Sequence, residues 1–310
     1  MSSNTTLGPG REFDAVRRLL ALWGDAASGV GDDAAVLSVP AGERLVVSTD
    51  STVENVHFRR EWLSASATGW RAAASALSDL AAMAATPLGI LVSLSLPESW
   101  RDEIEELARG IGDAVRAADT TIVGGDLTGA SELAISVTVL GHAVSPLTRA
   151  GARAGDTLYV TGTLGGPRAA IEALLRGEEP SPALRARFER PVPRIVEARW
   201  LAAHGAHAAI DVSDGLAGDV AHIAAASGVS IELQLDTLPA IAGVSAIDAF
   251  ASGEEYELVV AAPHLDTDAF ERDFGVPLTA IGRVERGTPD VVAWLAGQRV
   301  ALPGGFDHFS

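Results

Sequence analysis

Segments with the apolar spacing of helices alternate with short apolar runs typical of strands along all 310 residues. We expect helices over 11–24, 66–86 and 98–119, with strands between them and with Ser99 at the start of the third helix. No short-period repeat is visible. The alternation therefore predicts a mixed α and β (α+β) protein in which helices pack on sheets.

The pattern breaks once and then restarts. Near residue 148 the composition changes to turn residues and arginine, and strand and helix patterns then begin again. In the second half, the stretch "ERPVPRIVEARWLAAHG" over 189–205 is expected to be a connector rich in Pro and Arg. We therefore predict two domains, residues 1–148 and 149–310.

Two missing residue types exclude several kinds of chemistry. Lysine and arginine together number 23, and all 23 are arginine, so the chain contains no lysine. A P-loop, a protein-kinase ATP site and a Schiff base each need a lysine and are excluded in their usual forms. The absence of cysteine excludes a thiol nucleophile and agrees with a cytoplasmic protein. The net charge of −18 argues against nonspecific binding of nucleic acid, and no apolar run is long enough for a membrane span.

Aspartates stand at the ends of apolar runs that should be buried. "HAAIDV" ends such a run with an aspartate, and the same feature recurs in the first half; the positions are Asp33, Asp50, Asp79, Asp126 and Asp211. An unpaired buried carboxylate costs at least several kcal/mol, roughly, so each must be protonated, paired or bound to a metal. Ser213 and Asp214 have a simpler explanation, as an N-cap and as an acid in the first turn of the next helix.

A hard divalent cation is the simplest partner for these carboxylates. Mg²⁺ takes carboxylate and hydroxyl oxygens and shares its coordination with substrate phosphates. Ser48 and Thr49 offer further oxygens, and Gly124 and Gly125 allow a phosphate to approach the backbone closely. Each motif alone is more often a turn or a cap. Together they predict a site with several metal ions and phosphates.

Nine motifs, in order, resemble the thiamine-monophosphate kinase family, which belongs to the superfamily of aminoimidazole ribonucleotide synthetase. They cover almost the whole chain: "GVGDDAAVL", "STDSTVENVHF", "LSDLAAM", "VGGDLT", "TRAGARAGD", "RPVPRI", "DVSDGLAGDVAHIA", "GEEYEL" and "GGFDHF". The resemblance implies ATP-dependent phosphorylation of thiamine monophosphate to thiamine diphosphate, by direct in-line transfer. It also implies ATP in a cleft between two domains, and a homodimer whose N-terminal halves pair into a β-barrel.

The resemblance also implies roles for individual residues. No general base is implied, and Asp211 and Arg149 take part in the Mg²⁺-assisted transfer. The nucleotide contacts are Gly125, Asp126, Arg149 and Ser213. The thiamine phosphate contacts are His57, Glu254 and Phe306. The Mg²⁺ ligands are Asp33, Ser48, Thr49, Asp50, Asp79, Asp126, Asp211 and Asp214.

The chain departs from the family pattern at a few positions. "SGEEYEL" replaces the usual "GGEDYEL", so that Ser252 and Glu255 stand for glycine and aspartate, and the longer Glu255 is expected to alter the substrate pocket. Ala84 and Asn55 stand where glycine is common. Three alternatives stay open at this point: another ATP-using enzyme of the superfamily, a metal-dependent phosphatase, and a non-catalytic protein that binds thiamine phosphate or nucleotide.

Overall fold

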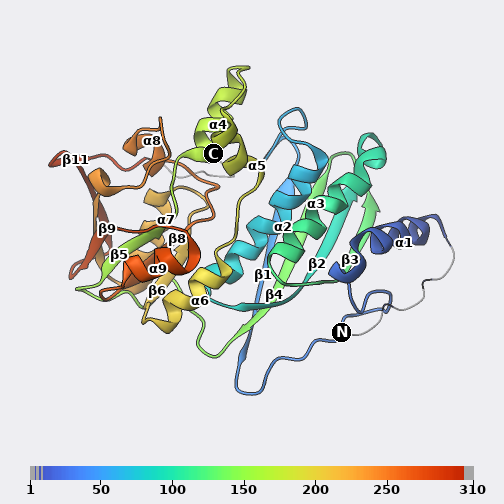
Figure 1. Ribbon diagram of the computed structural model, residues 1–310, viewed down its shortest axis with the longest axis horizontal. Helices are drawn as coiled ribbons and strands as arrows, with labels where there is room; N and C mark the ends of the chain where they lie inside the picture. The colour runs from blue at the N-terminus through green and yellow to red at the C-terminus, as the bar shows by residue number, and fades with distance from the viewer. Residues whose placement is uncertain (1–3, 5–6, 8–9, 304–310) are drawn as a thin grey trace. The chain divides into compact units, whose positions relative to one another are not determined.

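The computed structural model describes residues 4, 7 and 10–303, and these form two compact units. The N-terminal unit comprises Met1–Leu80 and Ala85–Ser145, and the C-terminal unit comprises Ala81–Ala84 and Pro146–Ser310. Each unit has its own sheet and helices (Figure 1). Within the described part of the chain, no helix is long and apolar enough to cross a membrane.

The sheet of the N-terminal unit has four strands in the order β1-β4-β2-β3. They are β1 (Arg44–Val53), β2 (Thr86–Leu96), β3 (Ile122–Gly129) and β4 (Ala134–Ala143). β4 pairs antiparallel with β1 and β2, whereas β2 and β3 run parallel. Along β4 every second residue is buried, so the two faces of the sheet differ in exposure. The sheet is open and is not a closed barrel.

Two helices, α2 (Ala65–Ala82) and α3 (Ile104–Ala117), cover one face of this sheet, and α1 (Arg11–Trp23) packs against α3. Short 3₁₀ turns are η1 (Gly24–Ala26) and η2 (Glu98–Glu103). α2 and α3 touch closely, since a Cβ at Gly110 would lie 1.9 Å from the carbonyl oxygen of Ser66. The expected single helix over 98–119 is wrong in its first turn, because η2 follows Pro97 and α3 begins only after Glu103.

The C-terminal unit holds a seven-stranded sheet in the order β11-β10-β7-β9-β5-β8-β6. Its strands are β5 (Thr157–Thr161), β6 (Ala208–Asp211), β7 (Ser230–Gln234), β8 (Leu258–Ala262), β9 (Leu278–Glu285), β10 (Asp290–Leu295) and β11 (Gln298–Val300). Only the β7–β10 pair is parallel. β8 lies between β5 and the edge strand β6 and is buried along its whole length, as expected for an interior strand of a covered sheet.

The helices of this unit are α4 (Gly166–Leu175), α5 (Pro182–Glu189), α6 (Ile195–Ala203), α7 (Leu216–Ser227), α8 (Ala246–Phe250) and α9 (Thr267–Phe274), with one 3₁₀ turn, η3 (Leu235–Thr237). α7 packs its Leu216, Val220 and Ile223 into the main apolar core. The expected connector over 189–205 is wrong in its second part, where α6 forms. Pro191 and Pro193 precede α6 and do not interrupt it.

Candidate active site

Ser48 and Asp79 lie against each other where β1 meets α2. The Ser48 Oγ donates a hydrogen bond of 2.5 Å to Oδ2 of Asp79, and both residues are half-buried. Alternation along β1 places Asp50 on the same face of the sheet as Ser48. Oδ1 of Asp50 accepts the N–H of Ser51 at 2.8 Å. Three of the predicted metal ligands therefore share the helix-covered face.

Thr49 and Asp126 belong to the opposite face of the same sheet. The Oγ1 of Thr49 lies 3.0 Å from the hydroxyl of Thr138 on β4. The strand register places Asp126 in the cross-strand row that contains Ser51 and Ser93, two residues along β1 from Thr49. The structure therefore divides the predicted ligands of this unit between two faces of one sheet.

A cavity of about 820 Å³ runs along this second face, bounded by α1, residues 30–37 and the sheet. It brings together Asp33, Gly125 and Asp126. The N–H of Asp33 donates to Oδ1 of the neighbouring Asp32 at 2.9 Å. A Cβ at Gly125 would lie 1.9 Å from the carbonyl oxygen of Val92, so strand packing alone requires glycine at this position.

The expectation of burial holds for only part of the aspartate set. Asp211 is buried, with 5 % of its surface exposed. Asp50 and Asp79 are half-buried, whereas Asp33 and Asp126 are exposed, so the expectation is wrong for these two. Both line the open cavity. The run that leads to Asp126 is buried at Ile122 and Val123, whereas the run after Asp33 is not buried, with Val36 95 % exposed.

His57 lies just after β1 in a turn that fixes its tautomer. The ring nitrogen Nδ1 of His57 accepts the backbone N–H of Val53 at 3.1 Å. The backbone N–H of His57 donates to the carbonyl oxygen of Val53 at 2.9 Å. Because Nδ1 accepts a hydrogen bond, the neutral ring carries its proton on Nε2. His57 can therefore donate a hydrogen bond from Nε2.

In the C-terminal unit, Asp211 ends β6 and a short turn leads into α7. The N-cap of α7 is Gly215, at a φ of +117°, so the prediction that Ser213 caps this helix is wrong. The reason is Asp219 in the first turn of α7, whose Oδ2 accepts the N–H of Ser213 at 3.2 Å. This reach-back fixes the turn that carries Ser213 and Asp214.

Three carboxylates lie within electrostatic range at this turn. Burial, together with the charges of Asp211 and Asp214, raises the pKa of Asp219 to about 8, although hydrogen bonds from the backbone act to lower it. Such a concentration of negative charge on oxygen donors fits a hard divalent cation. Among the residues the structure describes, no group of three or more His, Asp or Glu side chains is arranged to hold a metal ion.

The segment "GEEYEL" is joined to this turn by its backbone. The N–H of Glu254 donates to the carbonyl oxygen of Ser213 at 2.7 Å, and Tyr256 donates to Val212 at 2.9 Å. A Cβ at Gly253 would lie 2.6 Å from the same Ser213 oxygen. The predicted nucleotide residue Ser213 and the predicted substrate residue Glu254 therefore belong to one tightly packed assembly.

A buried ion pair behind this assembly was not foreseen. Arg194 donates from Nε and Nη2 to the two carboxylate oxygens of Glu257, at 2.7 and 2.6 Å. The hydroxyl of Thr161 donates to Glu257 at 2.6 Å. Burial alone would raise the pKa of Glu257, but the bonds and charge of Arg194 outweigh it and lower the pKa. The motifs "RPVPRI" and "GEEYEL" contained both partners, but not their pairing.

Two predicted site residues remain, Arg149 and Phe306. Arg149 is exposed, and its carbonyl oxygen accepts a hydrogen bond of 3.0 Å from the hydroxyl of Ser227 at the end of α7. Phe306 lies outside the described residues.

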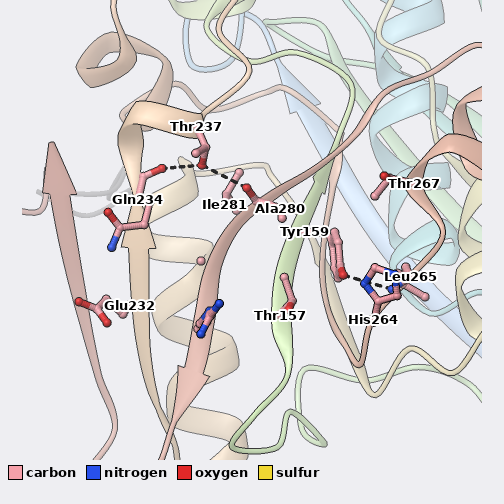
Figure 2. Close-up of a pocket in the computed structure, with 12 residues that line it drawn as sticks. Thr157, Tyr159, Glu232, Gln234, Thr237, His264, Leu265, Thr267, Ala280 and Ile281 are labelled. Carbon is pink, nitrogen blue, oxygen red and sulfur yellow. Dashed lines mark hydrogen bonds between the residues drawn. The ribbon is translucent and has the colours of Figure 1, made fainter. Parts of the chain in front are cut away.

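A second cavity, of about 600 Å³, lies over β5, β7 and β9 and is lined by Tyr159, Glu232 and His264 among others (Figure 2). Its lining contains none of the predicted site residues.

Comparison with known families and proteins gives matches along most of the chain. Residues 31–143 match the family described as AIR synthase related protein, N-terminal domain, and residues 153–294 match the corresponding C-terminal domain. A thiamine-monophosphate kinase of Rhodopirellula baltica is 38 % identical over 91 % of this chain and 91 % of its own length. That of Salmonella typhimurium is 35 % identical, covering 97 % of this chain and 96 % of its own.

Solved structures give the same result. The thiamine-monophosphate kinase of Stenotrophomonas maltophilia superposes with a TM-score of 0.80 at 34 % identity, covering 97 % of this chain and 100 % of that one. AaThiL complexed with AMPPCP and TMP gives a TM-score of 0.76 at 32 % identity, covering 96 % of each chain. The hydrogenase maturation protein HypE in complex with ATP reaches 0.82 over 97 % of both chains, but at 20 % identity this likeness concerns the fold alone.

Proposed function

This chain belongs to the thiamine-monophosphate kinase family, and we propose that it transfers the terminal phosphoryl group of ATP to thiamine monophosphate, yielding thiamine diphosphate and ADP. The observation that carries the proposal is the assembly in which the Asp211–Asp214 turn is hydrogen-bonded to the Glu254 segment. The complex of the related AaThiL with AMPPCP and TMP supports the choice of both substrates.

The reaction joins two phosphates and needs little covalent help from the protein. An oxygen of the thiamine phosphate attacks the γ-phosphorus, and the bond from that phosphorus to the leaving ADP oxygen breaks in line. A phosphate monoester is largely ionised near neutral pH, with a second pKa of about 6, so no general base is required. Alignment and neutralisation of charge are the main requirements.

We infer that Mg²⁺ assists this transfer. Mg²⁺, when bound, neutralises phosphate charge and aligns donor and acceptor. The donor chemistry supports this inference: Asp211 and Asp214 concentrate charge at one turn, and the contact of Ser48 with Asp79 presents hydroxyl and carboxylate oxygens together. The proposed ligands are Asp33, Ser48, Thr49, Asp50, Asp79, Asp126, Asp211 and Asp214.

The remaining roles are proposed from the family resemblance, and donor geometry or exposure supports two of them. His57 presents Nε2–H as a donor suited to a phosphate oxygen, and the exposed guanidinium of Arg149 offers a charged fork to phosphate. Further proposed nucleotide contacts are Gly125, Asp126 and Ser213, and further thiamine phosphate contacts are Glu254 and Phe306. We propose that residues 1–148 bind metal and ATP, and that residues 149–310 contribute to the ATP and thiamine phosphate sites.

Pairing of two N-terminal halves into a β-barrel is part of this proposal. The exposed Leu45 and Val47, on the face of the sheet that also bounds the 820 Å³ cavity, support it, because large apolar side chains on an open sheet favour burial against a partner. A cytoplasmic location stays a prediction from composition.

Product analysis separates the kinase from its alternatives. Purified protein is incubated with Mg²⁺-ATP and thiamine monophosphate, and thiamine species, nucleotides and inorganic phosphate are quantified. Equal formation of thiamine diphosphate and ADP is expected, with loss in Asp211→Asn but not in the exposed control Asp268→Asn. Inorganic phosphate without thiamine diphosphate indicates a phosphatase, and binding without turnover indicates a non-catalytic protein. Either result contradicts the proposal.

A further inference from the structure

Arg187, on α5, connects two buried carboxylates of the "GEEYEL" segment. Its Nη2 lies 3.3 Å from Oε2 of Glu255 and 2.9 Å from Oε1 of Glu257, and it donates to the carbonyl oxygen of Thr163 at 3.1 Å. The side chains of Glu255 and Glu257 are 0 % and 1 % exposed. The contacts are therefore shielded from water, where charge pairs are strongest and removal of one partner is most costly.

The segment held by these contacts has an unusual backbone. Glu254 and Tyr256 both adopt left-handed conformations, with φ of +56° and +54°, and they alternate with the two buried glutamates. A non-glycine residue in this region is strained, because its Cβ lies too close to the following carbonyl oxygen. Such conformations persist only where the surroundings impose them. Here the backbone is held by hydrogen bonds to Val212 and Ser213 on one side and by the buried carboxylates of Glu255 and Glu257 on the other.

The side chain of Glu255 reaches two separate elements. One carboxylate oxygen accepts the N–H of Gly165 at the start of α4, and the other meets Arg187 on α5. Burial raises the pKa of Glu255 to about 7, although contacts with Ser252, Arg187 and Gly165 favour the charged form. The charged pair at neutral pH thus depends on these partners.

We propose that Arg187 is a positioning residue for substrate binding: by holding Glu255 and Glu257 it fixes the left-handed backbone of Glu254 and so orients the Glu254 carboxylate toward thiamine phosphate. The inference rests on the proposed function in one respect, the assignment of Glu254 to the substrate. It also gives the longer Glu255 a place in this chain, because its carboxylate contacts both Gly165 at the start of α4 and Arg187 on α5.

The test compares two arginines of one helix. Arg187→Gln removes the bridge, whereas the control Arg185→Gln removes a similarly half-buried arginine of the same helix that pairs with Glu179 and Glu189. Binding of thiamine monophosphate is measured by calorimetric titration in Mg²⁺, and KM is measured for both substrates. For Arg187→Gln, the Kd and KM for thiamine monophosphate are expected to rise about tenfold, with the KM for ATP within about twofold. Arg185→Gln leaves all of them unchanged.

Conservative and double variants separate positioning from general damage. All three contacts of Arg187 come from Nη2, so the single cation of Arg187→Lys is expected to recover part of the lost affinity. Glu255→Gln should weaken substrate binding too, and the double variant should lose less than the product of the two single losses. An unchanged Kd in Arg187→Gln, an equal rise of both KM values, or Arg187→Lys as impaired as Arg187→Gln would overturn the proposal.

Failure of the proposed function has a different signature. A wild-type protein that binds thiamine monophosphate but forms no diphosphate contradicts the kinase assignment alone, and the titration still tests Arg187. A wild-type protein that does not bind thiamine monophosphate contradicts both.

Discussion

Replacing Arg194 by methionine should destabilise the C-terminal unit, because the buried carboxylate of Glu257 then loses its main cationic partner. The variant loses the two hydrogen bonds, of 2.7 and 2.6 Å, from Arg194 to Glu257. Glu257 keeps its hydrogen bond from the Thr161 hydroxyl and its contact with Nη2 of Arg187 at 2.9 Å. Breaking a buried ion pair from one side costs about 3–5 kcal/mol. Because Arg187 still compensates part of the charge, we expect the lower end, about 3 kcal/mol.

The loss should depend on pH with a definite sign. Arg194 holds the pKa of Glu257 below its ordinary value, so the pair contributes stability above the ordinary pKa of glutamate and loses it as the pH falls through the lowered value. In Arg194→Met, burial is opposed by fewer charges and the pKa of Glu257 rises. Protonation then relieves the variant as the pH falls. The difference in unfolding free energy between wild type and variant should therefore be larger at pH 8 than at pH 5.5.

Urea unfolding followed by circular dichroism at both pH values measures this difference. Arg199→Met is the matched control, because Arg199 is exposed on the neighbouring α6. The double variant Arg194→Met/Glu257→Gln should be less destabilised than Arg194→Met, since it leaves no buried charge unpaired. The reasoning is refuted if Arg194→Met costs less than about 1 kcal/mol, or if its cost is the same at both pH values.

Three further predictions concern single positions. Gly253→Ala puts a Cβ 2.6 Å from the Ser213 carbonyl, so kcat/KM for ATP should fall at least about tenfold with an unchanged circular dichroism spectrum; wild-type activity would contradict the close packing. Gly218→Ala, in α7 with open space around it, should raise the unfolding free energy by about 0.5–1 kcal/mol in thermal melts, and a lower melting temperature would contradict this. Asp79→Asn should raise the Mg²⁺ concentration for half-maximal activity, unlike Asp268→Asn; equal Mg²⁺ curves would argue against metal binding at Asp79.

Local patterns in the sequence were enough to predict elements whose signals lie within them. The end of a strand at Asp211 and a helix beginning shortly after it were both foreseen, because an apolar run followed by helical spacing is a local signal. α6 was missed because the prolines around 191–193 were taken as a connector, although they precede the helix. The expected N-cap role of Ser213 was wrong because the side chain of Asp219, inside α7, accepts the backbone N–H of Ser213.

The sequence proposes the site residues one by one but not their arrangement in space. Strand alternation separates Ser48 from Thr49 onto different faces, yet both were expected to bind metal, because the resemblance carries residue types and not side-chain directions. The contact between Arg187 and Glu255 joins positions 68 residues apart, and no local pattern reports such a pairing. Buried charge networks of this kind need the folded structure to be seen.

The most direct test of the account is to follow the γ-phosphate itself. ATP labelled at the γ-phosphorus is incubated with the protein, Mg²⁺ and thiamine monophosphate, and the labelled products are separated. We predict that the label appears in thiamine diphosphate in an amount equal to the ADP formed. Label found in inorganic phosphate, with unlabelled thiamine monophosphate recovered, would contradict it.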